Sequence, residues 1–157
     1  MENYMKMEIA AVGENESFAR SVVAAFALPL NPTITELSDI KTAVSEAVTN
    51  CIVHAYGKQG KDKNIVIECK TQEKDGEGVL HIAIADQGCG IEDVEQALLP
   101  FFTTLENDER SGMGFTIMQT FMDDFSVKSV RGKGTTVEML KRIGGDKNAE
   151  IRKKVNA

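Results

Sequence analysis

A carboxylate and a carboxamide four residues apart, Glu46 and Asn50, are the first side chains in this sequence that could do chemistry together. Residues at this spacing lie on one face of a helix. An amide oxygen suits Mg²⁺, which in nucleotide sites takes one or two protein oxygens and otherwise phosphates and water. The carboxylate could orient or deprotonate an incoming hydroxyl group. Taken alone, the pair also fits an ordinary solvated helix face.

A second candidate element is the segment Asp86-Gln87-Gly88-Cys89-Gly90. Asp86 stands where an apolar strand ends, so its carboxylate can accept a hydrogen bond from a donor such as an adenine amino group. Gly88 and Gly90 allow the backbone to approach a ligand and to adopt positive φ. An ordinary turn between a strand and a helix has the same composition.

A third element, Arg110-Ser111-Gly112-Met113-Gly114, leads into a helix. Amides at a helix N-terminus favour phosphate, and glycines remove the side chains that would block it. Arg110 could reach a terminal phosphate with its charged guanidinium. The sequence has no Gly-Lys-Ser/Thr, so this is not a P-loop, and it lacks the full Rossmann fingerprint.

Hydrophobic periodicity and turn residues predict the elements that position these groups. Thr33 to Glu36 has the spacing of a capping box and should begin the longest helix, which runs to about Tyr56. Asn15 should cap an earlier helix. The other expected elements are strands at 5–12, 65–70, 79–85, 125–130 and 135–140, and further helices at 92–99 and from about 114 to 122.

Tight turns at 75–78 and 131–134 join adjacent strands, which implies an antiparallel or mixed sheet with helices packed on one face. The predicted fold is therefore α+β, a two-layer sandwich whose mixed sheet is mostly antiparallel. We expect one domain over residues 1–143 and a short polar tail over 144–157.

Composition excludes several functional classes. The formal net charge of −6 over 157 residues disfavours general nucleic-acid binding. Three cysteines without a Cys-x-x-Cys spacing argue against a disulfide framework and a structural zinc site. No apolar run is long enough to span a membrane, and the N-terminus is too polar for a signal peptide. We expect a cytoplasmic protein.

In this order the three elements resemble those of the ATP-binding fold shared by gyrase, Hsp90, histidine kinases and MutL, the Bergerat or GHKL fold. Residues 45–50 resemble its N box, 86–90 its first glycine box and 110–114 its second. Thr135, after the Gly132-Lys133-Gly134 turn, matches the family threonine near the adenine. The resemblance covers residues 5–142.

Segments 15–20, 45–50, 100–104 and 110–118 narrow the resemblance to the anti-sigma F factors of sporulation. Members of that family are serine kinases that bind a sigma factor and phosphorylate a small anti-anti-sigma protein. The resemblance implies ATP and Mg²⁺ as cofactors and a homodimer. It also implies that Glu16 and Arg20 contact partner proteins.

The same resemblance implies specific roles around the nucleotide. Glu46 would be the catalytic base, Arg110 a γ-phosphate contact, Asn50 the Mg²⁺ ligand and Asp86 the adenine reader. The full set of implied nucleotide contacts is Asn50, Asp86, Gly88, Gly90, Thr104, Ser111, Gly112, Met113, Gly114, Phe115 and Thr135.

Two other functions remain open on the sequence. One is a binding module in which ATP only orders residues 100–112 and so shapes a partner surface. The other is the catalytic half of a split histidine kinase. Between Asn50 and Tyr56 there is no Lys or Arg, which histidine kinases commonly carry there.

Overall fold

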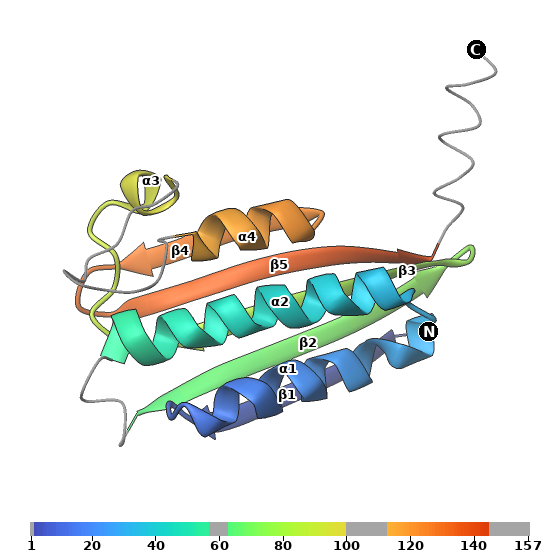
Figure 1. Cartoon of the computed structure of the whole chain (residues 1–157), viewed down its shortest axis with the longest axis horizontal. Coiled ribbons are helices and arrows are strands. Elements are labelled where there is room, and N and C mark those ends of the chain that lie inside the picture. The colour runs from blue at the N-terminus through green and yellow to red at the C-terminus, as the bar shows by residue number, and fades with distance from the viewer. Residues whose placement is uncertain (1, 57–62, 100–112, 145–157) are drawn as a thin grey trace, which may run out of the picture.

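The computed structural model describes residues 2–56, 63–99 and 113–144. Its five strands form one sheet in the order β1-β2-β3-β5-β4, and each pairing is antiparallel. Helices α1, α2 and α4 cover one face of this sheet (Figure 1). The predicted α+β sandwich is confirmed, without a parallel pair among the described strands. The elements are β1 (Glu2–Ala10), α1 (Glu14–Ala27), a 3₁₀ turn (Leu28–Leu30), α2 (Ile34–Asn50), a π-helical segment (Cys51–Tyr56), β2 (Asn64–Lys74), β3 (Glu77–Asp86), α3 (Val94–Ala97), α4 (Gly114–Phe121), β4 (Asp124–Val130) and β5 (Gly134–Gly144).

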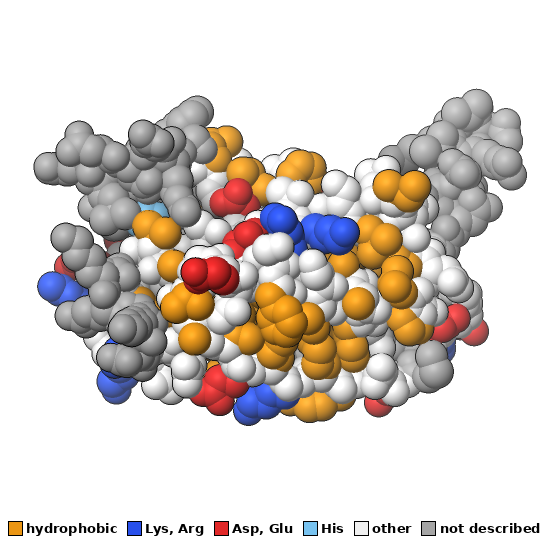
Figure 2. All heavy atoms as spheres, turned by 60° about the horizontal axis from the view of Figure 1, so that its bottom comes forward, with side chains coloured by type: hydrophobic (Ala, Val, Ile, Leu, Met, Phe, Trp, Pro, Cys, Tyr) orange, Lys and Arg blue, Asp and Glu red, His pale blue; other side chains and the backbone are white. Residues whose placement is uncertain are grey.

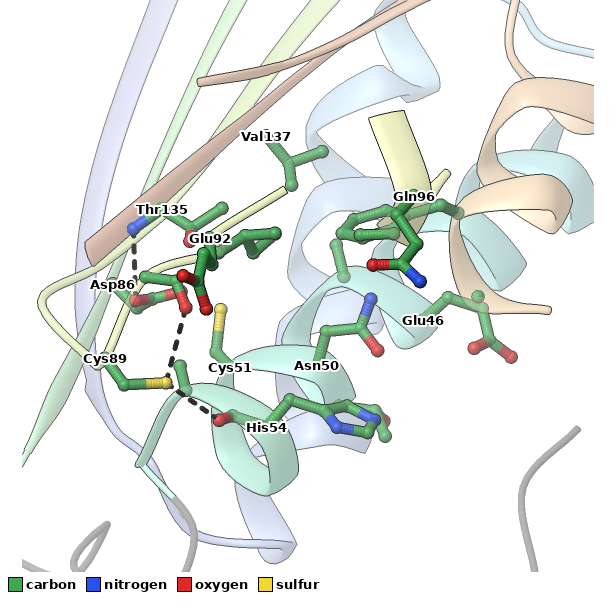
Figure 3. A pocket seen from close by; sticks show the side chains of 18 of the residues that line it. Glu46, Asn50, Cys51, His54, Asp86, Cys89, Glu92, Gln96, Thr135 and Val137 are labelled. Carbon is green, nitrogen blue, oxygen red and sulfur yellow. Dashed lines mark hydrogen bonds between the residues drawn. The ribbon is translucent and has the colours of Figure 1, made fainter. Parts of the chain in front are cut away.

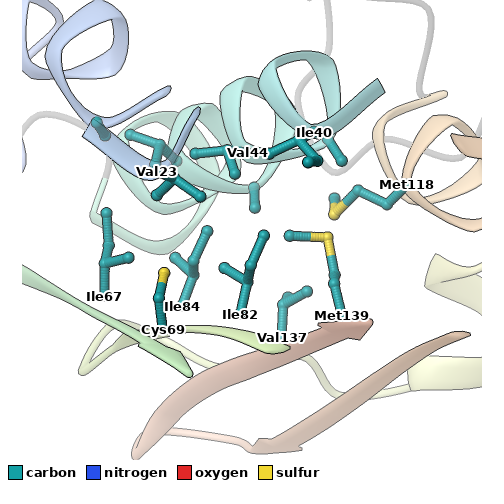
Figure 4. Close-up of a cluster of buried hydrophobic side chains, with 14 of the residues drawn as sticks. Val23, Ile40, Val44, Ile67, Cys69, Ile82, Ile84, Met118, Val137 and Met139 are labelled. Atoms are coloured by element: carbon teal, nitrogen blue, oxygen red, sulfur yellow. The ribbon is translucent and has the colours of Figure 1, made fainter. Parts of the chain in front are cut away.

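The core lies between the sheet and the helices (Figure 4). Alternate residues of β3, Leu80, Ile82 and Ile84, are almost wholly buried, as the period of two in a strand requires. Ile40 and Val44 of α2 meet them from the helical layer. Each such side chain contributes about 1.5–3 kcal/mol when fully buried. This packing fixes α2, and with it the Glu46/Asn50 pair, over the sheet.

The predicted start of α2 is confirmed. The Thr33 side chain accepts a hydrogen bond from the Glu36 backbone amide at 3.1 Å, which satisfies one of the free amides of the first turn. The helix continues to Tyr56, but beyond Asn50 it widens into a π-helical turn. Hydrophobic periodicity predicted the length of this helix and not its change in winding.

Three local expectations need correction. Asn15 does not cap α1: the helix begins at Glu14, and the side-chain amide of Asn15 instead donates to the Ala10 carbonyl at 2.9 Å. The last strand continues past Leu140 to Gly144, because Lys141 and Ile143 are buried in the alternating pattern of β5. Residue 144 therefore belongs to the sheet, and the rest of the expected tail, 145–157, lies outside the described residues.

None of the helices in the described ranges is long and apolar enough to cross a membrane. The three cysteines carry free thiols: Cys51 and Cys69 are buried, and Cys89 is exposed.

Candidate active site

A pocket of about 880 Å³ opens between the C-terminal end of α2, the loop after β3, the start of α4 and the β4–β5 turn. Asp86 and Thr135 lie at one end of it and Glu46 lies at the other, with Asn50 between them (Figure 3). This order of residues suits an elongated ligand such as a nucleotide. If its base lay near Asp86, its phosphates would extend towards Asn50 and Glu46.

The Glu46/Asn50 pair faces the first residue of α4. A Cβ atom on Gly114 would lie 3.2 Å from Glu46 Oε2, 3.2 Å from Asn50 Nδ2 and 3.3 Å from Asn50 Oδ1. Only glycine therefore fits there without displacing one of the two side chains. The backbone amides of the first turn of α4 and the side chains of Glu46 and Asn50 therefore line the same wall of the pocket. A phosphate group bound there could contact both the amides and these side chains.

Asp86 is 8% exposed at the end of β3. Its Oδ1 accepts hydrogen bonds from the backbone amides of Gly88 at 2.9 Å and Thr135 at 3.3 Å. Burial raises the pKa of the Asp86 carboxyl, and the hydrogen bonds from Gly88, Cys51 and Thr135 oppose that rise. Asp86 is thus a buried, oriented acceptor at the inner end of the pocket.

The glycine loop is held on two sides. Cys89 donates its amide to the Ala55 carbonyl at 3.1 Å, and its own carbonyl accepts from the Gly132 amide at 2.7 Å. Gly90 has a φ of +72°, and a Cβ there would collide with the Val130 carbonyl. This close approach explains the glycine at 90.

Tyr56 ties the end of the long helix to the same loop. Its hydroxyl accepts from the Gln87 amide at 2.6 Å and donates to the Asn64 carbonyl at 2.7 Å. On the other side of the loop, the hydroxyl groups of Ser129 and Thr135 lie 2.8 Å apart, and Ser129 also accepts from the Ile91 amide at 2.7 Å. Asp86 is therefore supported by both the helix and the β4–β5 hairpin.

Comparisons with known proteins agree with this geometry. Residues 9–141 match the family described as the histidine kinase-like ATPase domain. Anti-sigma F factor from Thermoanaerobacter sp. (strain X514) is 53% identical over 92% of this chain and 97% of its own length. The anti-sigma F factor of Geobacillus kaustophilus (strain HTA426) is 50% identical over 94% and 97%. The chain belongs to the anti-sigma F factor family of histidine kinase-like ATPases.

Solved structures show the same fold at low identity. The structure of the RsbU and RsbW domains of a Mycobacterium tuberculosis protein matches with a TM-score of 0.59 and 15% identity over 90% of this chain and 33% of that one. The catalytic domain of histidine kinase ThkA, in a nucleotide-free form, matches with a TM-score of 0.51 and 14% identity over 88% and 98%.

The structure of this anti-sigma F family member brings most of the expected nucleotide contacts together. Eight of the residues singled out from the sequence line the pocket: Glu46, Asn50, Asp86, Gly90, Met113, Gly114, Phe115 and Thr135. Gly88 does not line it. A Cβ on Gly88 would lie 2.5 Å from the Ala55 carbonyl oxygen, so this glycine makes room for the helix rather than for a ligand. Thr104, Arg110, Ser111 and Gly112 lie outside the described residues.

Glu16 and Arg20 lie on α1, away from this pocket. Their side chains pair at 3.1 Å, with exposed fractions of 22% for Glu16 and 41% for Arg20. The Ser45 hydroxyl also donates to Glu16. Glu16 therefore bridges α1 to the residue that precedes Glu46, and the more exposed Arg20 is the better placed of the two to meet another protein.

Several pocket residues were not anticipated as nucleotide contacts: Cys51, His54, Glu92, Gln96 and Arg131. The spacing of four from Asn50 could have placed His54 on the same helix face. Arg131 and Glu92 form an ion pair at 3.3 Å between the hairpin and the loop after β3. That contact joins residues 39 positions apart, which no local pattern reveals.

The residues present fit Mg²⁺ bound chiefly through a nucleotide. Among the described residues no group of three or more His, Cys, Asp or Glu could form a metal cage by itself. Asn50 offers one hard amide oxygen beside the carboxylate of Glu46. A site with one or two protein oxygens suits an ion that keeps phosphate and water as its other ligands.

Proposed function

We propose that this protein is an anti-sigma factor that binds and inhibits a sigma factor of RNA polymerase, and that it uses ATP and Mg²⁺ to phosphorylate a serine of an anti-anti-sigma partner. The name shared by its relatives supports the first part. The convergence of Glu46, Asn50 and Gly114 on the pocket that contains Asp86 carries the second.

Each end of the pocket has its own task. At the inner end, Asp86 would accept a hydrogen bond from the adenine amino group, with Thr135 beside it. At the outer end, amides that open α4 would bind phosphate oxygens. Asn50 would hold Mg²⁺, which when bound would neutralise part of the phosphate charge. Arg110, from the second glycine box, is proposed as a further γ-phosphate contact.

Glu46 supplies the proton acceptor for transfer. The serine oxygen would form a bond to the γ-phosphorus while the bond from that phosphorus to the β–γ bridging oxygen breaks and ADP leaves. The hydroxyl proton would pass to the Glu46 carboxylate. General-base catalysis contributes roughly 10²–10⁴-fold in rate, and positioning and charge stabilisation provide most of the rest.

The test is Glu46→Gln, which preserves size and removes the basic carboxylate. We expect phosphoserine formation on a purified anti-anti-sigma protein to fall by roughly a hundredfold or more while ATP binding is retained. The matched control is Glu68→Gln, a half-buried position on β2 that pairs with Lys6 at 3.4 Å and lies away from the pocket. Unchanged phosphorylation by the Glu46 variant would remove this residue from its role.

The same assay separates the alternatives. Retained ATP affinity without transfer to any partner would favour a binding module. A product that loses its phosphate in acid would indicate phosphohistidine and a split histidine kinase, whereas phosphoserine survives acid. We expect the acid-stable product.

The partner surface is proposed to include α1. Hydrophobic side chains gather on the face that α1 forms (Figure 2), and Phe18 on this helix is 51% exposed. Arg20, whose side chain is 41% exposed and pairs with Glu16, adds a guanidinium group to this face. Charge reversal, Arg20→Glu, should weaken partner capture with little change in ATP binding, because Arg20 is not among the pocket residues. The homodimer likewise remains a proposal, which sedimentation can test.

A further inference from the structure

A lysine is buried at the far end of α4 from the pocket. Lys141 on β5 is 6% exposed and lies between the buried residues Met139 and Ile143 of the same strand face. Lysine is almost never buried at this level unless its charge is paired. The sequence pattern does not explain this residue, because an aliphatic side chain would suit the position in β5.

The Lys141 ammonium joins three elements. Nζ lies 3.0 Å from Asp39 Oδ2 on α2, whose side chain is 21% exposed. It also donates to the Phe121 carbonyl oxygen at 2.5 Å. Phe121 is the last residue of α4, where carbonyl groups have no partner within the helix and where the helix dipole favours a positive charge. The ammonium thus caps α4 and ties that end of the helix to α2 and β5.

The two ends of α4 both meet α2. Gly114 opens α4 against Glu46 and Asn50 near the end of α2, and Phe121 closes it at the ammonium bound by Asp39, eleven residues before Asn50. The helices are neighbours in the same layer (Figure 1). Because α4 has only eight residues, a tilt or slide at its capped end is transmitted directly to Gly114.

We propose that Lys141 is a positioning residue for the phosphate end of the pocket. Its buried ammonium fixes the C-terminal end of α4 on α2 and thereby sets the distance between Gly114 and the Glu46/Asn50 pair. This role rests on the proposed function, in which that distance determines how phosphate and Mg²⁺ are held. The hydrogen bonds that hold Asp86 and its loop come from Gly88, Thr135 and Tyr56, at the opposite end of the long helix from Asp39. We therefore expect recognition of the base at Asp86 not to require this clamp.

The first test compares nucleotides that differ in their phosphates. In Lys141→Met we expect weaker ATP binding and a loss in kcat of roughly ten- to hundredfold, since misplacement by about 1 Å can cost that much. AMP binding should change little. All measurements are made at a temperature where circular dichroism shows the variant to be folded.

Two further variants separate positioning from stability. The double variant Asp39→Leu/Lys141→Met replaces the ion pair by apolar groups, which often restores stability. We expect it to stay impaired with ATP, because the Phe121 carbonyl has still lost its cap. Ile67→Ala creates a cavity in the core on β2, which two strands, β3 and β5, separate from β4 in the sheet. It should lower thermal stability without the selective loss of ATP binding.

Hydrogen exchange tests the positioning role of Lys141 even if the protein has no kinase activity. The Ile117 amide, which donates to the Met113 carbonyl at 2.8 Å, reports on the first turn of α4. We expect it to exchange faster in Lys141→Met than in Ile67→Ala when their melting temperatures match. Wild-type exchange at Ile117, or wild-type discrimination between ATP and AMP in the double variant, would overturn the positioning role. Absence of nucleotide binding in the wild-type protein would instead refute the proposed function alone.

Discussion

Gly114→Ala tests the geometry of the candidate site with a single methyl group. The new Cβ would lie 3.2 Å from Glu46 Oε2 and 3.2 Å from Asn50 Nδ2, closer than carbon ordinarily approaches such atoms. Both neighbours are the ends of flexible side chains, so they can move by a few tenths of an ångström. We therefore expect the methyl group to displace the site residues rather than to unfold the protein.

The effect on stability can be worked out from opposing contributions. Alanine is about 1 kcal/mol more favourable than glycine within a helix. Forcing a side chain about 30° from its rotamer costs about 0.5–1.5 kcal/mol. These contributions nearly cancel, so the free energy of unfolding should stay within about 1 kcal/mol of the wild-type value.

The effect on activity should be much larger. A misplacement of about 1 Å can cost roughly a hundredfold in rate, so a shift of a few tenths of an ångström predicts a loss of about tenfold in kcat. The assay is transfer of labelled phosphate from ATP to the partner serine, with urea unfolding measured in parallel. Gly13→Ala is the control, because a Cβ at Gly13 meets nothing within 4 Å. Wild-type transfer by the Gly114 variant would refute the requirement for a close fit between α4 and the Glu46/Asn50 pair.

Three other substitutions test separate supports of the pocket. Asp86→Asn should abolish adenine recognition without loss of stability near neutral pH. Burial raises the pKa of Asp86 above its ordinary value of 3.8. The free energy of unfolding therefore falls as pH rises from 3.8 through the raised pKa, because the folded protein then has to lose a proton that it holds more tightly than the unfolded chain. Asparagine removes this part of the pH dependence in urea unfolding. Tyr56→Phe should lower the free energy of unfolding by about 1–3 kcal/mol, because the Gln87 amide loses its partner; equal unfolding midpoints would contradict this. Thr33→Ala should cost about 1 kcal/mol through loss of the α2 cap, with kcat unchanged.

The sequence predicted the parts of this fold that depend on local patterns. The turn at 75–78 and the apolar segment that ends at Asp86 predicted β3, and the capping box at Thr33 predicted where α2 begins. The pocket residues were found because three short motifs, distant in sequence, occur in a recognisable order. Their individual patterns are common, and only the order pointed to one site.

Long-range contacts escaped sequence reasoning. The charge of Lys141 in β5 is compensated by Asp39, 102 residues earlier, and by a backbone carbonyl. Gly88 was expected beside a ligand, yet its missing side chain accommodates Ala55 at the end of the long helix. In both cases the explanation lies in which elements meet across the sheet, and neither spacing nor composition encodes that.

The π-helical turn after Asn50 explains how one helix can supply both the candidate metal ligand and the support for the adenine end. The last carbonyl groups of a helix have no partner inside it, and here the Ala55 carbonyl accepts the Cys89 amide of the glycine loop. Widening from α to π winding changes the direction in which residues 51–56 face relative to Asn50. Because Tyr56 then reaches the Gln87 amide, the loop that carries Asp86 is fixed to the same helix that carries Glu46 and Asn50. Hydrogen bonds between one helix and the glycine loop therefore join the two ends of the pocket, and in-line transfer from a bound nucleotide requires such fixed positioning.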